Sequence, residues 1–232
     1  MVASVEEDQV TVGNNQAPQA WIKKYFREGD AEKIQQAVKA AESKTSGDIV
    51  PMVVHRSANL SHVSPTVFLL LYVTILLAGT HFLVEERDVN FLIFALSAGV
   101  FSLLVAIAAG YIELIQRLVL PRRLLNHEVH TRAELEFYRN HFDQTKSHGA
   151  VLIFISLFER RVVVLCDQFL AKKVPQQRWD TVAEIISSSM KQNNLLEGLL
   201  KALVLSGAIL AEVLPGDGSQ PHEISTDFRI QE

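Results

Sequence analysis

Two long stretches without charged residues lie in the first half of the chain, and they constrain its fold more than any other feature. Neither Ser57–Val84 nor Val89–Ile112 contains an Asp, Glu, Lys or Arg residue. An α-helix rises about 1.5 Å per residue, so roughly 20 apolar residues cross the hydrocarbon core of a bilayer. Two buried helices of a soluble protein are the alternative, but such helices rarely lack a charged stripe over this length. The pattern therefore predicts two transmembrane helices, at residues 63–84 and 89–112.

The charges around these stretches predict how they lie in a membrane. Only Glu85–Asp88 separates the two stretches, and this connection is net acidic, so the helices should form a tight hairpin. Basic residues flank the hairpin on its other side: Lys44, Arg56, Arg117, Arg122, Arg123 and Arg132. Because Lys and Arg are enriched in cytoplasmic segments beside transmembrane helices, we expect both chain termini in the cytoplasm. Residues 1–20 lack an apolar core, so no cleavable signal is expected and the first membrane helix must direct insertion.

Composition excludes several classes of protein. The formal net charge is −4, whereas domains that bind nucleic acid usually carry a basic excess. The sequence contains neither a G-x-G-x-x-G nor a Walker motif, so no nucleotide site is indicated. Cys166 is the only cysteine and can form no internal disulfide, which agrees with a reducing compartment.

The segments on either side of the hairpin together predict one α/β domain. Residues 21–56 contain a helix from about Asp30 and a buried strand over Ile49–Val54, which is too little for a core of its own. Residues 124–214 supply the missing elements. Because two crossings return the chain to the side that it left, both parts can fold together in the cytoplasm.

The second part of this domain is predicted to hold three helices and a β-hairpin. Its first helix covers residues 128–146 and places Leu135, Tyr138 and Phe142 on its apolar side. The remaining elements are strands over Val151–Leu157 and Val162–Cys166 and helices over Pro175–Gln192 and Leu195–Leu214. The last helix is rich in apolar residues, but its charged residues share one face, which favours a buried helix of the domain over a third crossing. Outside the domain we expect a flexible leader over residues 1–20 and a loose tail over residues 215–232.

Two motifs lie on either side of the predicted hairpin. They are Thr45-Ser46-Gly47-Asp48-Ile49-Val50 before the hairpin and Gly149-Ala150-Val151-Leu152-Ile153-Phe154-Ile155-Ser156-Leu157-Phe158-Glu159-Arg160-Arg161-Val162 after it, followed by Asp167 and Trp179. As a pair, they resemble the TPM domain family, and in particular the bacterial membrane proteins in which a two-helix transmembrane hairpin interrupts that domain. The resemblance covers residues 30–214. It implies an α/β sandwich with a mixed sheet, in the bacterial inner membrane. Plant relatives are linked to photosystem II repair and described as acid phosphatases, and an animal relative is an auxiliary protein of acetylcholine receptors.

Three carboxylates and two arginines are the candidates for chemistry. Asp167 ends a buried strand, Asp48 precedes the first strand and Glu159 lies in the turn between the second and third strands. Brought together by folding, these oxygens could bind Ca²⁺ or Mg²⁺. The alternative is that Asp167 caps a turn while the other two are solvated or paired with arginines. Arg160 and Arg161 could contact phosphate or lipid headgroups, or could only make the turn soluble.

Two functions from different classes follow. The leading hypothesis is a membrane-tethered interaction or assembly module that acts on other membrane proteins. It rests on the lack of a recognisable catalytic set in the sequence and on the family resemblance. The competing hypothesis is a metal-dependent phosphatase that uses Asp167 with Asp48 or Glu159. We expect no cofactor beyond such an ion, and the sequence predicts no oligomeric state.

Overall fold

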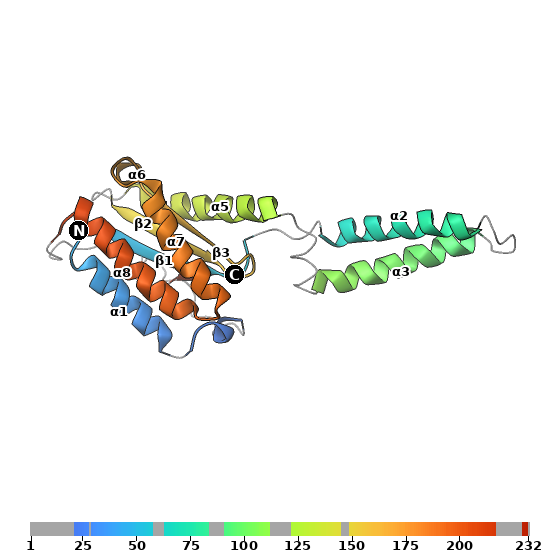
Figure 1. The fold of residues 1–232 in the computed structure, drawn as a ribbon, viewed down its shortest axis with the longest axis horizontal. Helices are drawn as coiled ribbons and strands as arrows, with labels where there is room; N and C mark the ends of the chain where they lie inside the picture. The colour runs from blue at the N-terminus through green and yellow to red at the C-terminus, as the bar shows by residue number, and fades with distance from the viewer. Residues whose placement is uncertain are drawn as a thin grey trace, which may run out of the picture.

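The computed structural model describes residues 21–27, 29–57, 63–83, 91–111, 122–144, 149–216 and 229–231. They form a mixed α/β domain and a long helical hairpin that projects from it (Figure 1). The predicted leader over residues 1–20 and the acidic connection Glu85–Asp88 lie outside the described residues.

The centre of the domain is a mixed sheet of four strands in the order β3-β2-β1-β4. The strands are β1 (Asp48–Val54), β2 (Ala150–Ser156), β3 (Arg161–Cys166) and β4 (Arg229–Gln231). Strand β1 runs parallel to β2 and β4, whereas β2 and β3 form an antiparallel hairpin. Because β1 precedes the helical hairpin in the chain and β2 follows it, the two flanks of the hairpin share one sheet.

Helices cover both faces of this sheet. One face packs against α1 (Asp30–Glu42), α7 (Gln176–Lys191) and α8 (Leu195–Val213), and the other packs against α5 (Arg122–Arg139). Shorter elements are η1 (Ile22–Lys24), η2 (Phe142–Gln144) and α6 (Gln168–Lys173). Every residue of β1 and β2 is buried, as expected for strands that are covered on both faces. Helix α8 lies in the domain against α1 and α7, so the preference for a buried helix over a third crossing is confirmed.

Helix α5 differs from its prediction in both its bounds and its buried face. It begins at Arg122, and Val129, Ala133 and Phe137 face the sheet, so Leu135 and Tyr138 are exposed. The buried side of α5 also carries Glu136, which is 1% exposed and lies 3.1 Å from a guanidinium nitrogen of Arg132. Asn140 donates a further hydrogen bond to the Glu136 carboxylate at 3.3 Å. In the sequence, a charged residue such as Glu136 marks a solvent-facing position of a helix. Its place on the buried side of α5 therefore hid which face of the helix packs on the sheet.

The end of the chain also differs from its prediction. A loose tail was expected over residues 215–232, but residues 229–231 form β4 and pair with Met52–Val54 of β1. The side chain of Arg229 hydrogen-bonds to Asn140 and lies over the ring of Phe142 at 5.3 Å from its centroid. A strand of three residues has no periodicity that a sequence pattern could reveal. Residues 217–228 lie outside the described part of the chain.

Before the residues that pair with β4, the side of β1 that faces away from β2 has two outward-facing positions, Ile49 and Pro51. Neither of them offers a free backbone N–H group. The amide of Asp48 donates to Gly149 O at 3.0 Å, so the amides of alternate residues face β2 and those between them face the other way. On that outward side, the Ile49 amide donates to a carboxylate oxygen of the buried Glu42 at 2.8 Å. Pro51 comes next on the same side and has no N–H group. Pro51 thus lies on the part of β1 that β4 leaves unpaired, because β4 pairs only with the residues that follow it.

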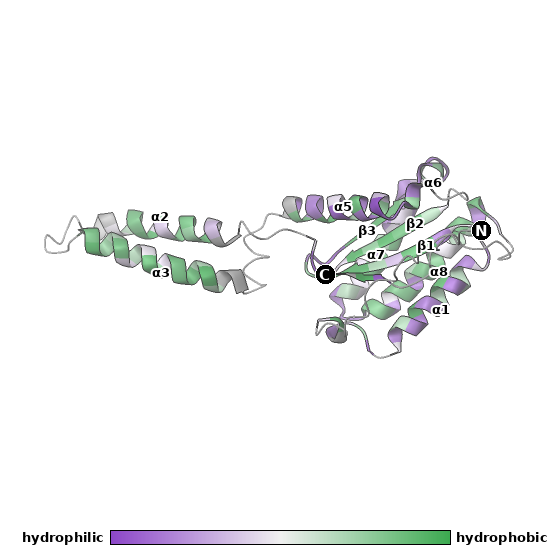
Figure 2. Ribbon diagram, turned by 180° about the vertical axis from the view of Figure 1, so that it is seen from behind, coloured by the Kyte–Doolittle hydropathy of each residue, from purple (hydrophilic) through white to green (hydrophobic). Residues whose placement is uncertain are grey.

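The helical hairpin consists of α2 (Val63–Leu83) and α3 (Phe91–Tyr111), which pack against each other. Gly79 allows a close approach, because a Cβ atom there would lie 2.0 Å from the Phe94 ring. Figure 2 shows mostly apolar residues along α2 and α3, in contrast to the many polar residues on the domain helices α1 and α5. Among the described residues, one window, Phe91–Ala108, is long and apolar enough to cross a membrane, and the apolar part of α2, Pro65–Gly79, is shorter. Two crossings therefore remain a prediction.

Candidate functional site

The first of the two motifs that carry the family resemblance lies at one end of the sheet, and the second runs along β2 from that end to the other. We call the end that holds Asp48, Ala150 and Asp167 the far end, and the end where β1 leaves toward α2 the hairpin end. The hairpin end includes the β2–β3 turn, Leu157–Arg160. The candidate carboxylates are thus divided between these two ends: Asp48 and Asp167 lie at the far end, and Glu159 lies at the hairpin end.

At the hairpin end, Glu159 fastens the chain that leaves β1. Its carboxylate accepts hydrogen bonds from the Ser57 amide at 3.1 and 3.3 Å and from the Ser156 hydroxyl. Amides of the turn add two more bonds, from Leu157 and Phe158 to the carbonyls at the end of β1, at 3.1 and 2.9 Å. The guanidinium of Arg56 lies over the Phe158 ring, 4.5 Å from its centroid. The turn therefore holds the segment that leads into α2.

Glu159 is buried, whereas the two residues that follow it, Arg160 and Arg161, point into solvent. Arg160 adopts a left-handed backbone conformation with φ of 52°, which turns the chain sharply before β3 begins. Arg160 and Arg161 are both exposed. Within the described residues, neither guanidinium has an ion pair or a hydrogen bond with a carboxylate.

At the far end, Asp167 caps a helix. It is the N-cap residue of α6, and its carboxylate accepts a hydrogen bond from the Leu170 amide at 2.9 Å. Burial, with the nearby negative charge of Asp167 as a smaller cause, raises the pKa of the Cys166 thiol to about 11. That thiol is therefore protonated at neutral pH and is no nucleophile. The alternative interpretation of Asp167 as a capping residue agrees with this geometry.

The Thr45–Asp48 segment joins three elements of the domain. The Thr45 hydroxyl donates to Leu214 O at 2.7 Å, just after α8, and accepts from the Gly47 amide at 3.1 Å. Gly47 itself lies so close to Gly149 that a Cβ atom on it would be 2.8 Å from the Gly149 carbonyl oxygen. The small and hydroxyl residues of this motif are thus explained by close packing between α1, β1 and the end of α8.

The sheet brings two of the three candidate carboxylates to one end and places the third at the other. Asp48 pairs with Ala150, and the Asp167 amide donates to Ala150 O at 3.2 Å, so the two aspartates flank one residue of β2. Two strand spacings separate their backbones, about 10 Å. Glu159 lies beyond the opposite end of β2, about 20 Å away at roughly 3.3 Å per residue.

An ion that needs ligands at about 2.3–2.6 Å cannot be shared by all three carboxylates. In the part of the chain that the structure describes, no three His, Cys, Asp or Glu side chains are arranged to hold a metal ion. What the structure retains of the predicted site is the pair at the far end, Asp48 and Asp167, which are 1% and 4% exposed.

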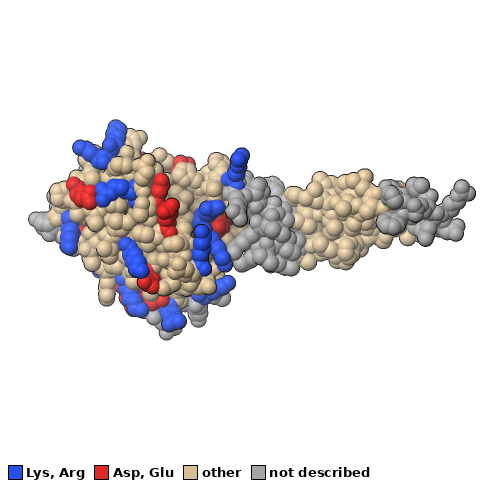
Figure 3. Space-filling view, viewed as in Figure 1, with Lys and Arg blue, Asp and Glu red and all other residues tan. Residues whose placement is uncertain are grey.

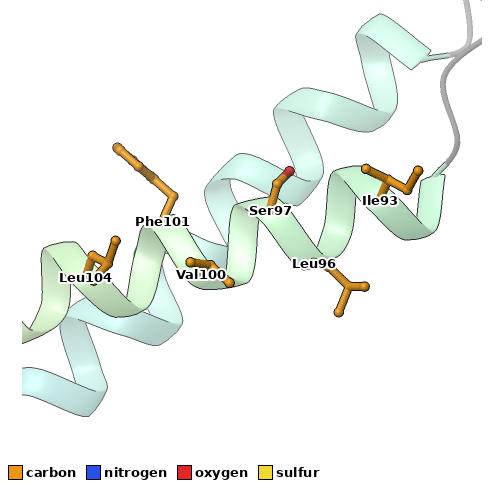
Figure 4. A pocket seen from close by; sticks show the side chains of 6 residues that line it. All are labelled: Ile93, Leu96, Ser97, Val100, Phe101 and Leu104. Atoms are coloured by element: carbon orange, nitrogen blue, oxygen red, sulfur yellow. The ribbon is translucent and has the colours of Figure 1, made fainter.

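A surface that sequence reasoning missed lies on the helical hairpin. Six side chains of α3 line an open apolar groove of about 500 Å³ (Figure 4): Ile93, Leu96, Ser97, Val100, Phe101 and Leu104. The Ser97 hydroxyl is occupied by its own helix, since it donates to Phe94 O at 2.8 Å. We call this surface the α3 groove. In the sequence it is indistinguishable from the rest of an apolar run, because only the helix geometry separates lining residues from their neighbours.

Comparison with known proteins shows the fold alone. No protein-family model matches the chain, and no curated protein matches it in sequence. The chain is similar to the solution structure of the BA42 protein from the psychrophilic bacterium Bizionia argentinensis, with a TM-score of 0.56 and 17% sequence identity. That similarity covers 90% of this chain and 98% of BA42. At this identity, it supports the α/β architecture and carries no statement about activity.

Proposed function

We propose that this protein is a membrane-tethered interaction or assembly module that acts on other membrane proteins. The observation that carries the proposal is the exposed apolar surface of the hairpin. Leu96, Val100 and Leu104, for example, are 64%, 60% and 61% exposed and follow one another along α3. Soluble monomers rarely expose a continuous apolar surface of this extent, whereas lipid covers such a surface without cost.

In this proposal α2 and α3 both cross the membrane. Helix α2 has 21 residues, which at about 1.5 Å each span roughly 30 Å. Basic residues at the domain ends of the hairpin favour a cytoplasmic domain and cytoplasmic termini, and the family resemblance favours the bacterial inner membrane. A reporter fused after Glu232 should be active only in the cytoplasm. Activity on the opposite side of the membrane would overturn this orientation.

The α3 groove is where we place the partner. Helices in membranes associate by fitting side-chain ridges into grooves, with no hydrophobic driving force between them. An apolar groove along α3 offers that kind of surface to a transmembrane helix of another protein. The α/β domain, fastened to the hairpin by Glu159, would then be held at a fixed place beside the partner.

A photo-crosslinking residue in the hairpin tests this proposal in native membranes. It replaces Phe101 in the groove or, as the matched control, Leu103, which is 51% exposed on the same helix but does not line the groove. We expect a discrete crosslinked membrane protein from the Phe101 position and only lipid adducts from Leu103. Equal crosslinking to proteins from both positions, or none from the groove, would refute the proposed docking site.

The phosphatase alternative now involves fewer residues. Any ion at the far end would be held by Asp48 and Asp167 without Glu159, since Glu159 lies at the other end of the sheet. Asp167 already binds the Leu170 amide through one carboxylate oxygen. An exchange of Asp167 that preserves the cap but removes the charge separates the two roles, and it is among the predictions below.

A further inference from the structure

We infer that the hairpin end of the domain is a binding surface for the phosphate headgroups of anionic lipids, formed by Arg160, Arg161 and Arg123. The inference rests on the proposed membrane tether and deepens it, because it adds a second contact between the domain and the membrane. We call these three arginines the headgroup surface.

The chain itself holds this surface close to the start of α2. Glu159, which precedes Arg160, is hydrogen-bonded to the Ser57 amide, and Val63 is the first residue of α2. At no more than about 3.6 Å per residue, the chain from Ser57 to Val63 spans at most roughly 20 Å. Wherever α2 enters the membrane, the turn that carries Arg160 and Arg161 must lie within that distance of the entry point.

Two elements bring Arg161 and Arg123 to the same side of the sheet. Along β3, Val163 and Leu165 face α5, so the alternation of the strand places Arg161 on that side too. Arg123 lies in the first turn of α5 and is exposed. No acidic residue is present in this turn, and the helix N-terminus adds a positive partial charge. Figure 3 shows several Lys and Arg side chains at the end of the domain next to the hairpin.

Three cations elsewhere in the domain have acidic partners, which these arginines lack in the part of the chain that the structure describes. Lys33, Lys201 and Arg178 each lie within 2.9 Å of a carboxylate oxygen. Within the described residues, the three arginines of the headgroup surface have no such partner, and Glu159 beside them is used by Ser57 and Ser156. An exposed guanidinium offers a planar set of donors that fits two phosphate oxygens. If the hairpin crosses the membrane as proposed, the phosphate groups of the lipids are the anions that lie nearest to these arginines.

Hydrogen exchange on the full-length protein in lipid nanodiscs tests the inference. The discs contain phosphatidylcholine alone, or phosphatidylcholine and phosphatidylglycerol in equal parts. Each basic residue near an anionic surface strengthens association about fivefold, so the amides of the β2–β3 turn should exchange at least about fivefold more slowly in the anionic discs. The double variant Arg160→Gln/Arg161→Gln should lose this difference.

The matched control removes two charges at the other end of the same strand. Lys172 and Lys173 are exposed on α6, beyond the far end of β3. The double variant Lys172→Gln/Lys173→Gln should keep the lipid-dependent protection. Equal protection in both types of disc, or equal loss in both double variants, would overturn the inference. So would protection in phosphatidylcholine discs on addition of inorganic phosphate, because the ligand would then be free phosphate.

Two readouts separate this inference from the membrane tether. Co-elution of the protein with the discs reports insertion, and exchange in the buried strand β2 reports whether each variant folds. A protein that does not enter the discs refutes the tether and the headgroup surface together. A protein that enters discs of both compositions but exchanges equally in them refutes the headgroup surface alone.

Discussion

The α/β domain and the α2–α3 hairpin are both rich in apolar residues, yet they treat them in opposite ways. In the domain, β1 and β2 are buried throughout and the surrounding helices turn polar faces outward. In the hairpin, side chains such as Leu77 and Leu92 are 69% and 67% exposed. Apolar content alone therefore says little about folding. The arrangement of those residues shows that one region folds around its own core, whereas the other leaves its apolar side chains exposed.

The two regions also differ in the hydrogen-bond partners of some of their polar side chains. Two buried carboxylates of the domain bind amides of other segments, since Glu42 binds Ile49 and Glu159 binds Ser57. The hydroxyl of Thr74 in the hairpin donates to a carbonyl of its own helix, Leu70 O, at 2.7 Å. A hydroxyl that satisfies itself within one helix needs no water, which suits a helix surrounded by lipid.

The same substitution in each region gives the largest expected contrast. Phe154 is fully buried in β2, so Phe154→Ala should lower the free energy of unfolding of the domain by about 3–5 kcal/mol. Phe101 is 56% exposed in the hairpin, and Phe101→Ala should change it by less than about 0.5 kcal/mol. Urea unfolding in detergent, followed by the fluorescence of buried Trp179, measures both. Similar losses in the two variants would mean that the hairpin packs onto the domain core.

A charge in each region gives the next contrast. Val100→Arg places a cation near the middle of the apolar window of α3 and should cost about 2.5–3.5 kcal/mol of membrane insertion. Leu135→Arg, at a site on α5 that is 54% exposed, should leave insertion unchanged. The fraction of protein that stays with the membrane after alkaline extraction reports the difference. Full retention of the Val100 variant would contradict a lipid-exposed α3.

The smallest effect concerns a polar group of the domain alone. Asp167→Ala removes the cap of α6 and should lower the free energy of unfolding by about 0.5–2 kcal/mol, whereas Asp167→Asn should lower it by only a few tenths. Urea unfolding of the two variants decides between them, and equal losses would argue against the capping role. Phosphatase activity present in the wild type but absent from the stable Asn variant would instead revive the metal-dependent alternative.

The elements that the sequence predicted well are those whose apolar residues are buried by neighbouring elements along their whole length. Strands β1, β2 and β3 and helix α8 lie close to their expected places, since long apolar runs and turn residues mark them. The buried face of α5 was missed because the charged Glu136 stands on it, where Arg132 and Asn140, four residues away on either side, bind its carboxylate. Strand β4 was missed because three residues carry no pattern and its pairing partner lies at the start of the domain.

The candidate site was predictable only at short range. The cap at Asp167 depends on residues within one turn, so local sequence could propose it. The separation of Glu159 from Asp48 and Asp167 depends on the register of β1 against β2, which no local pattern reveals. Likewise, the sequence identified Arg160 and Arg161 as basic residues in a turn, but only the folded structure shows where they lie relative to α5.

The pairing of β1 with β2 across the hairpin has a consequence for how the chain is made. Strand β1 leaves the ribosome first and must wait while both hairpin helices are synthesised, because β2 follows them. A waiting apolar strand is prone to pair with the wrong chain. On its outer edge, Glu42 occupies the Ile49 amide in the folded protein and Pro51 has no donor to offer. We expect these two residues to protect the outer edge of β1 once α1 and β1 have formed, before β2 is synthesised.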